Sequence, residues 1–396
     1  MGCTNSKVVA VAAADPPATE PPATSGPRRL HVVHFNDVYN LEPTGGHDGD
    51  PVGGAGRFAT KLKELRAKDP NLMVVFGGDL FGPSMMSGVT KGRHMVNVLN
   101  TLGIDYGCFG NHEFDFGMKG LLKTLYTPID RYGIKTKPTS TAWLSTNIDG
   151  ADGKPIGGCK KMDLVDWHGV KVGLISVSEN WLPGCNKLKA GEAVWLDDVA
   201  EATAACKELR AKGAEVVLLV SHSGIANDKK LMAQMPAELL DLCCGGHDHD
   251  YHRVEELRIV KAGQEWRYLV DIEFELPPAG ESGPAKLVKC EQVRIDDTIK
   301  EDPEIGGLVD TWQGLIKKKA SKVIGATAVD LNSTEAFLRW HEGELSNWVC
   351  DVVAEDYSAS EGVQKPDFAF LMGFTIAGKT IHNAGEITYG HLLSVR

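Results

Sequence analysis

From residue 30 onward, short apolar runs alternate with segments whose apolar residues recur at helical spacing. Phe58, Leu62 and Leu65 share one helical face between the first two runs, and further helices are predicted at 94–102 and 199–212. Strand-like segments also flank a turn at 277–284. This alternation predicts an α/β fold of sheets covered by helices. The predicted strands span 30–35, 72–79, 105–110, 143–147, 170–178, 215–223, 239–247, 268–276 and 286–295.

Fewer strands and helices are predicted toward both ends of the chain. Residues 8–28 are mostly Ala, Pro, Thr and Ser, a composition typical of a flexible tether. A long helix-like stretch over 303–323 is a candidate connector, followed by one helix at 336–354 and one strand at 367–372. The predicted organisation is a tether (1–28), a main domain (29–300), a connecting helix (301–324) and a thin second domain (325–396).

Composition narrows the classes of function. Lys and Arg number 42 against 53 Asp and Glu, for a net charge of −11, and no basic run interleaves with aromatic residues. A nucleic acid duplex is therefore not an expected partner, whereas small phosphorylated molecules remain possible because a bound metal can overcome net repulsion. The nine cysteines are an odd number without CxxC spacing, which indicates buried thiols in a reducing, cytoplasmic compartment. No apolar stretch approaches the ~20 residues that cross a bilayer.

The first residues, MGCTNSK, carry a candidate membrane anchor. Gly2 follows the initiator Met and Ser6 lies four residues on, which is the N-myristoylation pattern, and Cys3 beside it is a candidate for palmitoylation. Two acyl chains would hold the protein stably on the cytoplasmic face of a membrane. The alternative is a simple exposed tail.

Metal-binding residue types follow several predicted strands. They are Asp37 and Tyr39 in NDVYN, Asp79 in GGD, Asn111 and His112 in GNHEFD, His222 in SHSG, and His247 and His249 in GGHDH. Loops at the carboxyl ends of parallel strands converge in space, so these residues are expected to form one site. Oxygen and imidazole ligands suit divalent Mn, Fe, Co or Zn. A shared carboxylate can bridge two such ions about 3.5–4 Å apart, which polarises a phosphoryl oxygen and supplies hydroxide near neutral pH.

Each of these residues taken alone is more often a turn residue or helix cap, but the ordered series is very unlikely to arise by chance. The series resembles the calcineurin-type metallophosphoesterases and, more narrowly, the 5′-nucleotidase family, whose forms NHEFDFG and GHDH it shares. EGELSN (342–347) and GEITYGHLL (385–393) are similar to segments of that family's C-terminal domain. The resemblance implies a four-layer β-sandwich flanked by helices plus a partial α/β C-terminal domain.

The resemblance also implies roles for individual residues. Asp79 would bridge two metal ions, with Asn111, His222 and His247 completing one site and Asp37 and His249 holding the other. His112 and Asp115 would form the catalytic pair, in which the imidazole stabilises charge in the transition state and on the departing oxygen. Asp248 and Glu113 are expected to support the ligands or to form turns.

Three departures from the family pattern affect these expectations. Tyr39 stands where the family has a His, and it could either bind a ferric ion as a tyrosinate or pack beside a site that has lost a ligand. Met372 and Ala377 stand where the family has an Asn and an Arg that meet the substrate. The sequence ends at Arg396, before the family's aromatic clamp for the base. Little preference among bases is therefore expected.

The leading hypothesis is a dinuclear metal phosphohydrolase, with nucleoside monophosphates as the family's default substrates. Alternatives are a cyclic-nucleotide phosphodiesterase, a pyrophosphohydrolase acting on dinucleotides or nucleotide sugars, and a non-catalytic membrane-tethered scaffold. A protein Ser/Thr phosphatase is disfavoured because GGDLFGPS (77–84) replaces the GDxVDRG of that class. The oligomeric state is not predicted.

Overall fold

The computed structural model describes residues 26–394 except 46–50, 132–133, 282, 360–363, 365, 373–377 and 379. Gly2, Cys3, Ala377 and nearly all of the predicted tether lie outside the described residues. None of the helices within the described part is long and apolar enough to cross a membrane. The first strand begins at Arg28, one residue before the predicted start of the main domain.

The first of two large sheets has the strand order β18-β17-β1-β4-β5-β8. β1, β4, β5 and β8 run parallel, while β17 and β18 extend the sheet as an antiparallel hairpin beside β1. The bounds are β1 (Arg28–Phe35), β4 (Met73–Phe76), β5 (Tyr106–Cys108), β8 (Ala142–Leu144), β17 (Tyr268–Leu276) and β18 (Lys286–Arg294).

The second sheet has the order β10-β11-β13-β14-β16-β15. Its four central strands are parallel, and β10 and β15 are antiparallel edge strands. The bounds are β10 (Met162–Trp167), β11 (Val170–Ser178), β13 (Val216–His222), β14 (Leu242–Gly246), β15 (His252–Val254) and β16 (Ile259–Lys261).

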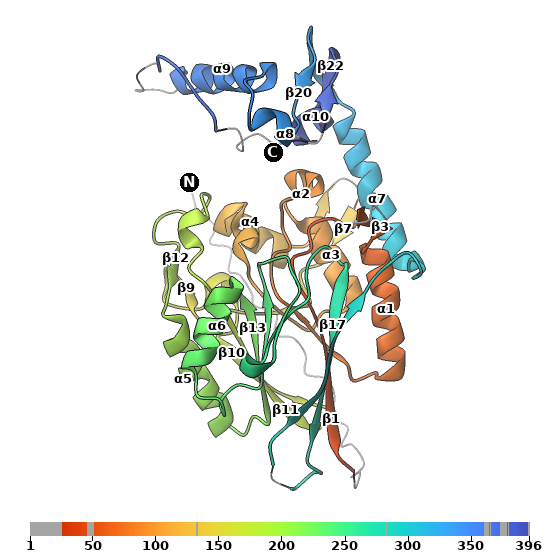
Figure 1. The fold of residues 1–396 in the computed structure, drawn as a ribbon, viewed down its shortest axis with the longest axis vertical. Helices are drawn as coiled ribbons and strands as arrows, with labels where there is room; N and C mark the ends of the chain where they lie inside the picture. The colour runs from red at the N-terminus through yellow and green to blue at the C-terminus, as the bar shows by residue number, and fades with distance from the viewer. Residues whose placement is uncertain are drawn as a thin grey trace, which may run out of the picture.

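The two sheets pack face to face, and helices cover both outer faces (Figure 1). Successive residues of a strand point to opposite faces, so Val32 lies in the core between the sheets and Val33 in the core under the helices. This arrangement confirms the expected four-layer α/β sandwich. The covering helices are α1 (Ala55–Lys68), α3 (Arg93–Leu102) and α7 (Pro303–Ala320) on the first sheet, with α5 (Asp198–Ala211) and α6 (Ile225–Gln234) on the second.

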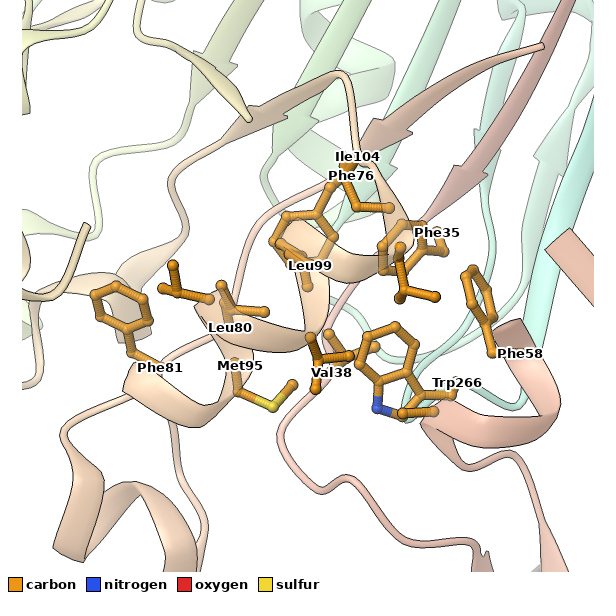
Figure 2. Packing of buried hydrophobic residues seen from close by; sticks show 14 of the residues in the cluster. Phe35, Val38, Phe58, Phe76, Leu80, Phe81, Met95, Leu99, Ile104 and Trp266 are labelled. Atoms are coloured by element: carbon orange, nitrogen blue, oxygen red, sulfur yellow. The ribbon is translucent and has the colours of Figure 1, made fainter. Parts of the chain in front are cut away.

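Aromatic and aliphatic side chains together fill the core between the first sheet and its helices (Figure 2). The ring of Phe35 lies 4.8 Å from that of Phe58 and 5.5 Å from that of Trp266. Because Phe35 is the last residue of β1, this packing holds the end of the strand from which Asp37 follows. The core thus supports the edge of the sheet at which the polar residues gather.

Several shorter elements were not predicted. All of them lie, in chain order, between strands of the two large sheets. They are β2 (Thr44–Gly45), β3 (Pro51–Val52), β6 (Ile129–Arg131), β7 (Ile134–Thr136), β9 (Ile148–Gly150), β12 (Ala193–Trp195), α2 (Met85–Thr90) and α4 (Gly117–Tyr126).

Residues 323–394, here called the C-terminal unit, follow α7, and α10 packs back against α7 and α2 (Figure 1). The small core of this unit consists of Leu331, Leu338, Leu345 and Ile387. Its elements are β19 (Val323–Thr327), β20 (Leu331–Asn332), α8 (Glu335–Leu338), α9 (Glu344–Ser358), β21 (Ile381–His382), β22 (Gly385–Thr388) and α10 (Tyr389–Ser394).

The helix predicted at 303–323 is present as α7, whereas two other predictions for this part of the chain were wrong. The connecting helix ends at Ala320, and Val323 already belongs to β19. The single helix at 336–354 is two helices, because α8 ends after Leu338 and Gly343 caps a new helix. Leu338 and Leu345 are both buried at a spacing of seven, so the apolar period passes over this break.

The predicted strand at 367–372 is also absent. Phe368, Phe370 and Met372 do alternate, but they are exposed, and this segment pairs with no strand among the described residues. Alternation alone predicts a strand only where a neighbouring strand supplies the ladder of hydrogen bonds. At 143–147, the strand likewise covers only Ala142–Leu144.

Candidate metal centre

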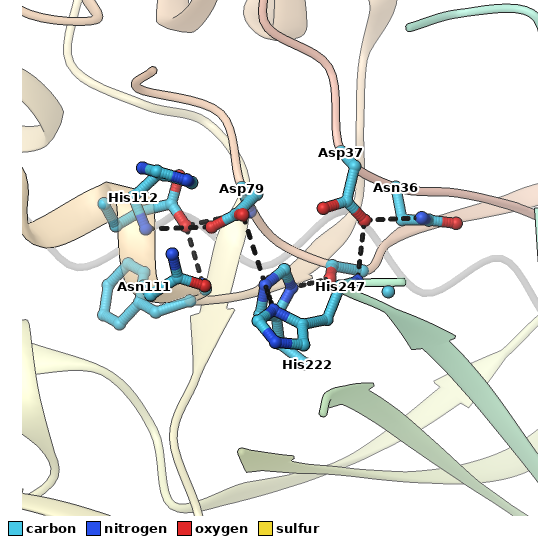
Figure 3. Close-up of polar contacts among 12 residues, drawn as sticks. Asn36, Asp37, Asp79, Asn111, His112, His222 and His247 are labelled. Atoms are coloured by element: carbon cyan, nitrogen blue, oxygen red, sulfur yellow. Dashed lines mark hydrogen bonds and ion pairs between the residues drawn. The ribbon is translucent and has the colours of Figure 1, made fainter. Parts of the chain in front are cut away.

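The predicted ligands gather at one edge of the sandwich. Asp37 follows β1, Asp79 follows β4 and Asn111 opens the short helix η1 (Asn111–Phe114) after β5. His222 is the last residue of β13, and His247 comes directly after β14. Figure 3 shows these five side chains facing a common centre from both sheets. The expected convergence of parallel strand ends is therefore present.

The backbone is strained at four of the predicted ligands. Asp37, Asp79, His247 and His249 have φ of 53°, 65°, 85° and 65°, in the left-handed region. Such conformations cost about 1–3 kcal/mol each and persist where the surrounding structure enforces them, most often at functional sites. Gly110 is required for close approach, since a Cβ there would lie 2.1 Å from Asp79 Oδ1. These features indicate a site built for precise placement of side chains.

One ligand group comprises Asp79, His222 and His247. Asp79 Oδ2 lies 3.3 Å from His222 Nε2, and His247 Nδ1 lies 3.2 Å from the same nitrogen. The other ring nitrogen of His222 hydrogen-bonds the carbonyl oxygen of Gly77 at 2.7 Å, which fixes the orientation of the fully buried ring. Beside this group, the buried Oδ1 of Asn111 has no hydrogen-bond partner among the described residues. An unsatisfied oxygen in this position fits a cation ligand.

The second ligand group comprises Asp37, Asp79 and His249. His249 Nε2 lies 3.2 Å from Asp37 Oδ1. The Tyr39 hydroxyl oxygen lies among the same atoms, 3.0 Å from Asp37 Oδ1, 3.0 Å from Asp79 Oδ2 and 2.8 Å from His249 Nε2. A phenol has one proton to donate, so it satisfies one of these three contacts as a donor. The hydroxyl thus lies among the predicted ligand atoms, and whether Tyr39 is a ligand or a packing residue stays a prediction.

The carboxylates of this cluster shift the pKa values of the groups around them. Burial lowers the pKa of His222, but the Asp79 carboxylate outweighs it and raises that pKa to about 10. Burial raises the pKa of Asp79, and His222 more than reverses this, so the net shift is downward. A hydrogen bond that His249 donates to Asp37 raises the pKa of His249, whereas burial and two carboxylates raise that of Tyr39. A bound cation would compete with these protons for the same lone pairs.

Buried side chains form hydrogen bonds to the loops that carry the predicted ligands. Glu113 accepts hydrogen bonds from the backbone N–H groups of Asp79, Leu80 and Gly110 at 3.0, 2.5 and 2.6 Å. Asn36 donates to Asp37 Oδ2 at 2.5 Å. Glu113 therefore supports the loop of Asp79, in line with its expected indirect role.

His112 and Asp115 form the pair that the sequence suggested. His112 Nδ1 lies 2.9 Å from Asp115 Oδ2, and the backbone N–H of His112 donates to Asp79 Oδ1 at 2.9 Å. A cavity of ≈ 520 Å³ opens beside them, and Trp181, Lys187 and His247 are among its lining residues. The imidazole is thus placed at the boundary between the ligand cluster and space for a small molecule.

Two residues near the cluster were missed in the sequence. Glu179 directly follows β11, and its Oε1 lies 3.5 Å from His247 Nε2. Its place after a parallel strand is the signal that would have found it. Lys261, a charged residue ending an apolar strand, is fully buried beside the same loops.

A third group of candidate ligand atoms lies on β1 and β17 and comprises His31, Asp271 and Glu273. Lys289 Nζ lies 2.7 Å from Asp271 and 3.4 Å from Glu273, so an ammonium group already balances these carboxylates. We therefore interpret this group as an ion-pair network.

The residues at the strand ends fit divalent transition-metal ions. They offer carboxylate oxygens, imidazole nitrogens and one amide oxygen, the donor set that such ions prefer. The buried and unpaired Asn111 oxygen and the strained ligand backbones support the same assignment.

Comparison with known proteins identifies relatives of this chain. The family model described as calcineurin-like phosphoesterase matches residues 30–251, more than half of the chain. Snake venom 5′-nucleotidase from Naja atra is 25% identical over 362 residues, covering 83% of this chain and 65% of that protein. The 5′-nucleotidase of Homo sapiens is 23% identical over 364 residues, covering 83% and 60%. The chain thus spans less than two thirds of these relatives.

Solved structures share the fold. The 5′-nucleotidase precursor from Thermus thermophilus has a TM-score of 0.65 at 22% identity, covering 93% of this chain and 73% of that one. A putative 5′-nucleotidase from Staphylococcus aureus has a TM-score of 0.67 at 14% identity, covering 93% and 72%.

Proposed function

The chain belongs to the calcineurin-like phosphoesterase family, and on that premise we propose that it is a metal-dependent phosphoester hydrolase acting on nucleoside monophosphates. The observation that carries the proposal is the pair of ligand groups that share Asp79. The relatives named 5′-nucleotidases support the choice of substrate class. The chain covers only part of those relatives, so the substrate class is a proposal that a panel of phosphate esters tests.

We propose that the two groups hold two divalent ions, drawn from Mn, Zn, Co and Fe. Asp79 would be shared, with Asn111, His222 and His247 on one side and Asp37 and His249 on the other. Such ions polarise phosphoryl oxygens and activate water near neutral pH. The protein fixes the ligands through buried contacts such as the hydrogen bond from His222 to Gly77.

His112 would act on the substrate directly. Its hydrogen bond to Asp115 at 2.9 Å holds the proton at Nδ1 and leaves Nε2 for the phosphoryl group or the departing oxygen. Burial lowers the pKa of His112, but Asp115 and Asp79 outweigh that effect and raise it. A protonated imidazole suits both charge stabilisation and proton donation.

The adjoining cavity supports a small substrate. Its volume of ≈ 520 Å³ falls within the range of about 300–1,000 Å³ that is usual for small-molecule sites. Lys187 and several amide side chains line it, which suits a phosphorylated and polar molecule. The lining residues and the ligands all lie within 29–300, which we propose as the catalytic domain, joined through 301–324 to a partial C-terminal domain at 325–396.

Chelation and a substrate panel test this function. Dialysis against a chelator should abolish hydrolysis, and Mn, Co or Zn should restore it. The panel should comprise AMP, a cyclic nucleotide, a dinucleotide, a nucleotide sugar and an aryl phosphate. Full activity in metal-free protein would refute the metal-dependent mechanism. Metal-loaded protein that cleaves none of these would instead favour the non-catalytic scaffold.

We further propose that the N-terminus is acylated at Gly2 and Cys3, which would place the protein on the cytoplasmic face of a membrane. The motif MGCTNSK supports this proposal. Gly2→Ala should move the protein from the membrane to the soluble fraction, with Ser6→Ala, which keeps Gly2, as a milder comparison. An unchanged distribution for Gly2→Ala would reject the anchor.

A further inference from the structure

The Lys261 side chain contacts the ends of the two strands that lead to the histidines of the first ligand group. It ends β16, and β13, β14 and β16 are consecutive parallel strands of the second sheet. Gly245 of β14 pairs with Lys261, and His222 of β13 pairs with Gly246. The Lys261 side chain is fully buried, and it lies at the strand ends from which the His222 and His247 loops begin.

The Lys261 ammonium contacts the backbone immediately beside both histidines. Nζ donates to the carbonyl oxygen of Gly246, which precedes His247, at 2.8 Å. It also donates to the carbonyl oxygen of Ser223, which follows His222, and to Asp248 Oδ2. Asp248 lies between His247 and His249 in the chain. One buried cation therefore contacts the loops of three predicted ligands.

The surrounding structure makes room for this ammonium and balances its charge. Lys261 Nζ lies 2.8 Å from Asp228 Oδ2, and both side chains are buried. Gly245 leaves the space they occupy, because a Cβ there would lie 2.9 Å from Lys261 Cε and 3.0 Å from Asp228 Oδ2. With Asp248 the cluster has one cation and two carboxylates. It therefore adds no net positive charge beside the ligands.

A buried ammonium is costly to maintain. Removing an ion from water costs several kcal/mol, and an apolar group of similar volume in the same place is often neutral or stabilising. Stability alone therefore gives little reason for a charged residue at the end of an apolar strand. An ammonium can, however, draw together carbonyl oxygens from separate loops, which an apolar side chain cannot do.

We propose that Lys261 is a positioning residue that sets the placement of His222 and His247 and so raises the affinity of their site for divalent metal. The inference rests on the proposed function in taking these two histidines as metal ligands. Residues that orient metal ligands typically contribute 10–100-fold to metal affinity or activity. Lys261 would belong to that class.

The test compares Lys261→Met, the double variant Lys261→Met with Asp228→Asn, and Lys63→Met as the matched control. Lys63 also pairs with a buried carboxylate, Asp302, at 2.7 Å, but it contacts none of the predicted ligands. Co²⁺ is titrated into metal-free full-length protein and its affinity is read from its absorption spectrum, while the thermal midpoint is measured separately.

Lys261→Met should lower both the thermal midpoint and the Co²⁺ affinity, the latter by 10-fold or more. The double variant removes the unpaired Asp228 charge, so it should recover the midpoint while its Co²⁺ affinity stays low. Lys63→Met should keep its affinity within twofold. If the affinity of the double variant recovers together with its midpoint, Lys261 serves stability alone and the inference is wrong.

The same titration separates this inference from the proposed function. Weakened Co²⁺ binding in the Lys261 variants, together with a wild-type protein that hydrolyses no ester, would sustain the positioning role and reject the activity. Normal hydrolysis by the wild-type protein, together with an unaltered Co²⁺ affinity in all variants, would sustain the proposed activity and reject the positioning role. A wild-type protein that binds no Co²⁺ would overturn both.

Discussion

The sandwich and the C-terminal unit are built on different scales. The sandwich has three extensive apolar cores, and its polar edge carries the predicted ligands in strained backbone conformations. The C-terminal unit has a four-residue core and exposes large side chains, with Trp340 81% and Phe370 77% accessible. Strain at a site persists only where dense packing enforces it. The contrast explains why the candidate chemistry lies in the sandwich.

The largest expected difference concerns stability. Phe58 is fully buried against Phe35 and Trp266, so Phe58→Ala should destabilise the sandwich by about 3–5 kcal/mol. Leu345→Ala should affect the C-terminal unit and leave metal affinity unchanged, because Leu345 lies in the small core of that unit. Urea unfolding, followed in parallel by Co²⁺ retention, measures both effects. Equal loss of Co²⁺ in the two variants would show one cooperative unit and break the comparison.

The next effect concerns rate. His112→Ala should reduce kcat by on the order of 100-fold or more, because the imidazole is assigned to the transition state. The metal content of this variant should stay at the wild-type level. His222→Ala should show the opposite result, with lost metal, since His222 lies in the first ligand group. Stoichiometric metal loss in His112→Ala, with none in His222→Ala, would exchange the two roles.

The two regions also differ in how far the sequence predicts them. In the sandwich, apolar strands such as 170–178 and 215–223 were predicted closely because both faces of each strand are buried, which leaves a continuous apolar run. Because such strands run parallel, the residues that follow them could also be placed at one edge of the sheets. Their contacts could not be predicted, because the position of Tyr39 among three ligand atoms depends on packing between distant loops.

In the C-terminal unit, local pattern was a poor guide. The break between α8 and α9 lies before Gly343, the N-cap of α9, and the apolar spacing across it does not reveal it. The segment at 367–372 has the alternation of a strand without a pairing partner among the described strands.

Lys261 is a different case, because an isolated Lys in a sequence carries no sign of burial. Only the fold shows the carbonyl groups it joins.

A smaller effect is expected from Tyr39. If its oxygen is a ligand, Tyr39→Phe should weaken metal binding at the group of Asp37, Asp79 and His249 by roughly 10-fold, about 1.4 kcal/mol. If the metal is ferric iron, the purified protein should also show a charge-transfer colour that this variant lacks. Absorption spectra and metal analysis of both proteins provide the measurement. Colourless wild-type protein with full metal and activity, unchanged by Tyr39→Phe, would leave Tyr39 as a packing residue.

The smallest effect concerns the choice of substrate, and it asks whether the C-terminal unit contributes to recognition. The cavity beside His112 is lined by residues of the sandwich, with none from the described part of the C-terminal unit. Stacking of a base on an aromatic side chain is worth ~1–3 kcal/mol at single-strand sites, and exposed Phe370 is the aromatic residue to test. We expect kcat/KM for AMP to exceed that for an aryl phosphate by less than 100-fold, which corresponds to ~2.7 kcal/mol. Phe370→Ala should leave this ratio within about twofold, since the metal ligands and His112 act on the phosphate that both substrates share. A preference above 100-fold that Phe370→Ala removes would assign recognition of the base to the C-terminal unit and end the division between the two regions.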